Sequence, residues 1–140
     1  MDTANGRSRM EHLSEIARNT FWGYVGCELE FMDEKKVIVT LDVREHHLNL
    51  IGILHGGVHT TLLDSAMGII AMAARPGEDV VTSSMNVHFT SPVRIGKVTV
   101  IAEILHTSGK TITTQGTLRS ADDTLCALAT ASFRIIEKKA

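Results

Sequence analysis

Residues 55–75 read HGGVHTTLLDSAMGIIAMAAR, and this stretch predicts a buried helix at the centre of the fold. From Gly57 to Arg75, apolar side chains surround the helical wheel on all sides, as expected of a helix enclosed by other elements. The sequence Arg75-Pro76-Gly77 then ends the pattern. Small and polar residues nevertheless form one stripe, so something other than hydrocarbon is expected to face it; the stripe contains Gly57, Thr60 or Thr61, Asp64 and Gly68.

Outside this helix, apolar and polar residues alternate as they do in strands. Strands are expected over residues 26–33 and 36–43 before the helix, and over 80–90, 97–107, 110–118 and 124–136 after it. Cys27, Leu29 and Phe31 are expected on one face of the first strand. The turn Ser108-Gly109 links two strands as a hairpin, which implies an antiparallel sheet.

An S-x-x-E capping box at Ser8 and Glu11 predicts the start of a short amphipathic helix over residues 9–20, with a packing role only. The first eight residues are expected to be disordered. The predicted fold class is α+β. A single domain over residues 1–140 has one long central helix wrapped by a five- to six-stranded antiparallel sheet.

Composition argues against several classes of function. The formal net charge is −2 and the basic residues are scattered, which does not fit a nucleic-acid-binding protein. No apolar run approaches the roughly 18 residues of a membrane span, so no membrane partner is expected. The N-terminus lacks the apolar region of a signal peptide, and a cytoplasmic location is expected. Cys27 and Cys126 are expected to be buried, reduced thiols.

Residues 55–64 also include candidate catalytic groups. Burying the Asp64 carboxylate costs free energy. A buried Asp64 therefore indicates either a function as general base or nucleophile, or hydrogen bonds from neighbouring threonines. Gly56 and Gly57 either let the chain turn into the helix or expose amides that polarise a carbonyl as an oxyanion hole does. Gly56 and Asp64 are about 12 Å apart along a helix, so a site that uses both favours two chains.

A metal site is the alternative interpretation of the histidines. His55 and His59 are four residues apart, with His46 and His47 upstream. The chain has no HExxH motif, and His55 sits at the helix end where ligand geometry is poorly defined. We therefore expect no metal, and we expect His46, His47 and His59 at the surface or at a pocket rim.

The spacing Asn49-x2-Gly52-x2-His55-Gly56-Gly57-x6-Asp64 resembles that of PaaI-type hotdog-fold acyl-CoA thioesterases, relatives of the hydroxybenzoyl-CoA thioesterases. The resemblance extends to MNVHFTSPVRIG (residues 85–96) and the SGKT turn, and covers roughly residues 20–136. It implies the hydrolysis of an acyl- or aryl-CoA to a free acid and CoA. It also implies a homodimer that pairs again into a homotetramer, with active sites at the subunit interface and no metal or organic cofactor.

The resemblance also assigns roles to residues. Asp64 would activate water or attack the thioester, while the Gly56 amide of the partner chain would polarise its carbonyl. Asn49 and His55 would position water and thioester. Thr82, or the adjacent Ser83, would assist the lytic water. His59 departs from the small or apolar residue that is usual there. Further residues are expected to bind the substrate: Gly57, Ser83, Arg94, Lys97 and Lys110.

Two other functions remain as alternatives. A hotdog dehydratase or hydratase would use His55 and Asp64 as an acid and base pair, but the HFPxxPxxPG loop of such enzymes is not in this sequence. A non-catalytic acyl-CoA-binding module on the same fold is the second alternative. The presence of Asp64, Gly56 and Asn49 argues against it.

Overall fold

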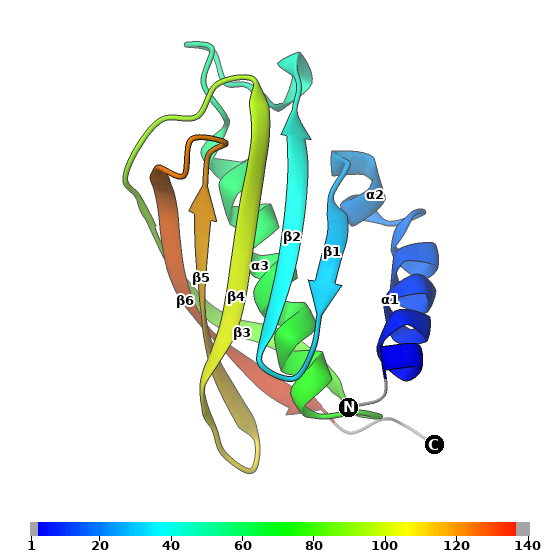
Figure 1. The fold of residues 1–140 in the computed structure, drawn as a ribbon. Coiled ribbons are helices and arrows are strands. Elements are labelled where there is room, and N and C mark those ends of the chain that lie inside the picture. Colours follow the sequence, from blue (N-terminus) through cyan, green and yellow to red (C-terminus); the bar gives the residue numbers. More distant parts are fainter. Residues whose placement is uncertain (1–2, 137–140) are drawn as a thin grey trace.

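The computed structural model describes residues 3–136 and has one six-stranded antiparallel sheet curved around a long helix (Figure 1). The sheet order is β1-β2-β4-β5-β6-β3. The fold class predicted from the sequence is therefore confirmed. The strands are β1 (Glu28–Met32), β2 (Lys36–Val43), β3 (Asp79–Phe89), β4 (Gly96–Thr107), β5 (Thr111–Arg119) and β6 (Leu125–Ile136).

The central helix α3 (Gly56–Ala74) matches the helix predicted over residues 57–75 to within one residue at each end. By length and hydropathy alone it would suit a membrane span. In the fold it packs against the sheet through one face, and several of its other side chains are only partly buried, so within one chain the helix is not enclosed on all sides as the sequence predicted. Its fully buried side chains include Leu62, Leu63, Ala66, Met67 and Ile70.

Strand β2 follows the predicted alternation, but β1 does not. Residues 37, 39, 41 and 43 are all buried in β2. In β1 a bulge between Leu29 and Phe31 breaks the register with β2. Because one extra residue reverses the side-chain direction, Phe31 is exposed and Met32 is buried. The prediction that Phe31 shares a face with Cys27 and Leu29 was therefore wrong.

The N-terminal helix also differs from its prediction. Helix α1 (Thr3–Ala17) begins before Ser8, so the proposed capping-box residues lie inside it and the expected disorder does not extend over residues 3–8. No proline stops the helix there, and a helix propagates easily once it is nucleated. A second short helix, α2 (Phe21–Val25), follows and ends at Gly26 in the left-handed region (φ 97°). Both lie beyond the β1 edge of the sheet (Figure 1).

Both cysteines are buried and unbridged. Burial raises the pKa of the Cys27 thiol to about 11. The expectation of buried, reduced thiols is therefore confirmed, and Cys27 has the character of an inert core residue.

Candidate active site

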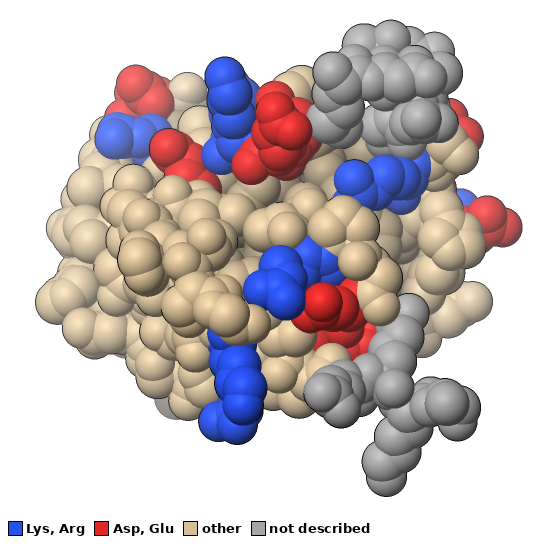
Figure 2. Space-filling view, turned by 90° about the horizontal axis from the view of Figure 1, so that it is seen from below, with Lys and Arg blue, Asp and Glu red and all other residues tan. Residues whose placement is uncertain are grey.

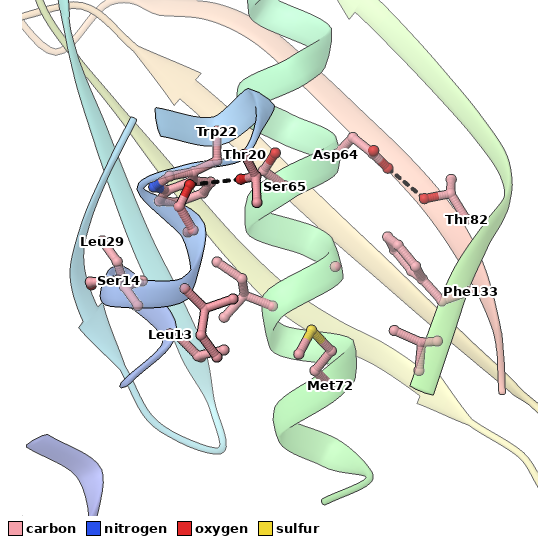
Figure 3. Close-up of a pocket in the computed structure, with 15 residues that line it drawn as sticks. Leu13, Ser14, Thr20, Trp22, Leu29, Asp64, Ser65, Met72, Thr82 and Phe133 are labelled. Carbon is pink, nitrogen blue, oxygen red and sulfur yellow. Dashed lines mark hydrogen bonds between the residues drawn. The ribbon is translucent and has the colours of Figure 1, made fainter. Parts of the chain in front are cut away.

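Asp64 and Thr82 come together at the surface of α3. The Thr82 hydroxyl donates a hydrogen bond to the Asp64 carboxylate, with 2.7 Å between Oγ1 and Oδ1 (Figure 3). A bulge between Thr82 and Ser84 in β3 gives the next residue a different partner: the Ser83 hydroxyl donates to the Ser132 carbonyl at 2.9 Å. Of the two neighbouring hydroxyls, the one on Thr82 therefore reaches the carboxylate.

The threonines of α3 do not satisfy Asp64. The Thr60 hydroxyl donates to the Gly56 carbonyl at 2.9 Å, and the Thr61 hydroxyl donates to the Gly57 carbonyl at 2.8 Å. Such bonds to the preceding turn are common for threonine in helices. The interpretation of Asp64 as a core residue held by neighbouring threonines was therefore wrong. Its carboxylate lies half-buried and has its hydrogen-bond partner on another element.

The N-terminus of α3 is organised by His55. This residue is the N-cap, and its Nδ1 accepts a hydrogen bond from the Gly57 amide at 2.8 Å. A Cβ at position 57 would lie 2.9 Å from Nδ1, so the cap requires glycine there. The Gly57 amide is thus engaged, whereas the Gly56 amide makes no hydrogen bond within residues 3–136. The unpaired donor at the positive end of the helix is that of Gly56.

Asn49 fixes the loop that leads into α3. Its Oδ1 accepts hydrogen bonds from the amides of Ile51 at 3.0 Å and Ile53 at 3.2 Å. The backbone N–H of Asn49 donates to the Ile53 carbonyl at 2.8 Å. Gly52 takes a positive φ of 82° within the same turn. Asn49 therefore holds the loop that carries the chain to His55.

Four of the five predicted catalytic residues line two separate cavities, and His55 lines neither of them. A cavity of about 360 Å³ runs between α1 and α3, with Asp64 and Thr82 on its wall (Figure 3); we call it the α1–α3 groove. A second cavity, of about 470 Å³, is lined by Asn49 and Gly56. We call it the helix-entry cavity. Neither cavity contains both Gly56 and Asp64. One chain thus carries the Asp64 half and the Gly56 half of the predicted active site at two different places along α3.

The predicted cationic residues are not brought together. Arg94 is exposed in the segment whose Val93 carbonyl accepts from the Leu54 amide, near the start of α3. Lys97 lines a polar pocket beside β2. Lys110 belongs to the β4–β5 turn, which accepts hydrogen bonds from Arg75 at the other end of α3. Figure 2 likewise shows basic and acidic side chains mixed over one face of the molecule.

Two histidines expected at the surface or at a pocket rim are buried, although each also lines a pocket: His47 the polar pocket beside β2, and His59 the helix-entry cavity. His47 Nε2 lies 2.7 Å from the Val25 carbonyl, and its Nδ1 accepts from the Arg44 amide at 2.9 Å. His59 packs edge-on against the Phe89 ring, and its Nδ1 has no hydrogen-bond partner among the described residues. Burial lowers the pKa of His59 below its usual 6.5. Within residues 3–136, no three His, Cys, Asp or Glu side chains form a group that could hold a metal.

Nothing in the sequence pattern indicates that α1 borders this site. Leu13, Ile16 and Ala17 line the α1–α3 groove, as does Trp22 from α2. The helical spacing of these residues in α1 was visible, but such spacing does not say which element a helix faces. The prediction of a helix that only packs therefore missed one wall of the groove.

Comparison with known proteins places the chain in a family. Residues 51–127, more than half of the chain, match the model of the thioesterase superfamily. Acyl-coenzyme A thioesterase 13 of Mus musculus is 37% identical over 78 residues, which are 56% of this chain and 56% of the mouse protein. The matched part also spans about half the length of the Pongo abelii and Homo sapiens proteins of the same name.

Solved structures agree over nearly the whole chain. A thioesterase of Haemophilus influenzae superposes with a TM-score of 0.87 at 25% identity, over 91% of this chain and 90% of that one. The E. coli PaaI protein gives a TM-score of 0.87 at 21% identity, over 99% of both chains. The chain therefore belongs to the thioesterase superfamily and has its hotdog fold.

Proposed function

We propose that this protein is an acyl-CoA thioesterase that hydrolyses an acyl- or aryl-CoA to a free acid and CoA. The observation that carries the proposal is the Asp64 carboxylate, held by Thr82 at 2.7 Å on the wall of a largely apolar groove. Membership of the thioesterase superfamily supports the reaction type. The name of the mouse relative supports CoA as the thiol carrier.

The reaction follows from the groups present. Water adds through its oxygen to the thioester carbonyl carbon while its proton passes to Asp64. The oxyanion that forms is stabilised by an unpaired backbone amide, for which Gly56 at the α3 N-terminus is suited. Collapse of the tetrahedral intermediate breaks the C–S bond, and the proton passes to sulfur. Direct attack by Asp64, followed by hydrolysis of the resulting anhydride, gives the same products.

A site shared between two copies of the chain reconciles the two cavities. Strand β3 ends the sheet order, so its outer edge has no strand partner among residues 3–136 and can pair with the β3 of a second copy. An isologous pair of this kind runs antiparallel and places the Gly56 end of one α3 toward the Asp64 region of the other. We further propose that such dimers pair into tetramers. The reaction as written needs no metal or organic cofactor.

The variant Asp64→Asn tests the proposal. Asparagine keeps an oxygen that can accept the Thr82 hydroxyl but cannot act as base or nucleophile, so CoA release should fall by about 10²–10⁴-fold. Release of free thiol from a panel of acyl-CoAs measures this, with circular dichroism to confirm folding. Unchanged release in the folded variant would refute the role of Asp64. A wild type that binds acyl-CoA without releasing thiol would instead favour a binding module.

A further inference from the structure

The α1–α3 groove follows the face of α3 that the sheet leaves uncovered. Its floor is a helical stripe in which Asp64, Gly68 and Met72 recur every four residues. The eight residues from Asp64 to Met72 span about 12 Å of helix. Figure 3 shows Asp64 near one end of this face and Met72 near the other. A linear molecule that reaches Asp64 at one end can therefore lie along the helix toward Met72.

The chemistry of the walls favours a hydrocarbon chain. Leu13, Ile16 and Ala17 form one wall from α1, and Val80 and Phe133 contribute from β3 and β6. Asp64 is the single charged residue among the described residues that line the groove. Charged phosphates would lose their hydration here without a cation in return, whereas an apolar acyl chain loses nothing by leaving water.

Gly68 deepens the floor one turn beyond Asp64. A Cβ at this position would lie 3.5 Å from the Phe133 ring, in ordinary contact, so the fold itself does not require glycine there. The missing side chain instead leaves space between Asp64 and Met72. This is where the first carbons of an acyl chain would lie if its carbonyl were beside Asp64.

Leu13 and Met72 close the far end. Both side chains line the α1–α3 groove and also a third cavity of about 250 Å³, which Pro76 and Asp79 line as well. The two cavities share these two residues, which therefore lie at the boundary between them; we call this pair the partition. Met72 is 39% exposed, and its unbranched side chain can be shortened without opening the core.

We propose that the α1–α3 groove binds the acyl chain of the substrate and that Leu13 and Met72 set the longest chain accepted. The substrate class is then an uncharged, apolar acyl-CoA whose chain ends at this partition. The inference rests on the proposed function, because it takes Asp64 as the place of the thioester carbonyl.

A chain-length profile tests the inference. The ratio kcat/KM is measured with straight-chain acyl-CoAs from acetyl to palmitoyl for the wild type, Met72→Ala and Leu13→Ala. Opening the partition should move the optimum to longer chains and raise kcat/KM for the longest substrates at least several-fold. Leu105→Ala is the matched control, since Leu105 is a half-exposed apolar side chain of β4 that lines none of these cavities. Profiles of folded Met72→Ala and Leu13→Ala that match the wild type would overturn the inference.

A binding measurement keeps this result separate from the proposed hydrolysis. Trp22 is the only tryptophan in the chain and lines the groove, so its fluorescence reports occupancy. In Asp64→Asn, where no carboxylate repels them, straight-chain fatty acids should change this fluorescence saturably. The tightest-binding length should increase when Met72→Ala is added. If the wild type hydrolyses no acyl-CoA but this shift occurs, the proposed function fails and the groove assignment stands. If fatty acids leave Trp22 fluorescence unchanged, the groove assignment fails.

Discussion

The contact between Thr82 and Asp64 is the smallest unit of the proposed chemistry. The Thr82 hydroxyl donates to one oxygen of the Asp64 carboxylate and so fixes the direction of the other oxygen. Thr82→Val keeps the shape of the side chain and removes the donor. We expect it to lower kcat by about 10- to 100-fold, equivalent to about 1.5–3 kcal/mol for a hydrogen bond to a charged group.

Thr82→Ser is the matched variant for that measurement, because it restores the hydroxyl without the methyl group. Steady-state kinetics on one acyl-CoA should show most of the activity in Thr82→Ser and little in Thr82→Val. Equal losses in both variants would mean that Thr82 acts by packing and not through its hydroxyl.

His59 makes stability depend on pH. Burial lowers its pKa, so the unfolded chain takes up a proton near pH 6.5 while the folded protein stays neutral to lower pH. The contribution of His59 to the free energy of unfolding is therefore fully present above pH 6.5. It is lost as the pH falls toward the folded-state pKa, by at most about 1.4 kcal/mol per pH unit. His59→Leu should remove this loss, and it also removes the unpaired buried Nδ1.

Urea unfolding across mildly acidic pH checks this expectation. The free energy of unfolding of the wild type should fall relative to that of His59→Leu as the pH drops below 6.5. The other histidines are present in both proteins, so the difference between the two curves isolates His59. Parallel curves would show that His59 does not contribute.

Among the elements, the first turn of α3 allows a test of the backbone amide alone. Gly56 is the first helical residue, and His55 before it has φ −62° and ψ 135°, the extended conformation that a following proline needs. Gly56→Pro should therefore keep the helix and remove the unpaired N–H. Loss of one oxyanion-hole donor costs about 10²–10³-fold in kcat.

Gly56→Ala is the control, since it keeps the N–H and adds only a Cβ. That Cβ would lie 3.5 Å from the Phe89 ring, an ordinary contact. The kcat of Gly56→Ala should remain within about 10-fold of the wild type, well above that of Gly56→Pro. If the two variants lose equal activity, the space at position 56 matters and the amide does not.

Comparison of the predicted and observed elements shows which structural features a sequence pattern can predict. Alternation located β2 at residues 36–43 correctly, because a strand with one buried face repeats every second residue. The bulge in β1 escaped this reasoning, since no residue type marks the extra position that exposes Phe31. The Asn49 to Asp64 motif gave candidate residues but not the engaged Gly57 amide, which depends on the rotamer of His55. The wall formed by α1 depends on tertiary packing that no local pattern contains.

At the scale of the whole molecule, the free edge of β3 and the two half-sites lead to the same expectation. An 11-residue edge strand with unpaired backbone groups is normally covered in a stable protein. Pairing of two β3 strands would cover it and join Gly56 of one chain with Asp64 of the other. Light scattering after size exclusion should therefore give a dimer or a tetramer. A monomer at the concentrations that support activity would contradict the shared site.

Mixing two inactive proteins tests the sharing directly. In a heterodimer of Asp64→Asn with Gly56→Pro, one site receives both mutations and the other receives Asp64 and Gly56 intact. Random exchange makes half of the dimers mixed, and half of their sites are complete, so about a quarter of wild-type activity should return. Differently tagged chains purified in tandem confirm that exchange has occurred. Sites contained within one chain would instead leave every site with one mutation, and the purified heterodimer would be as inactive as its parents.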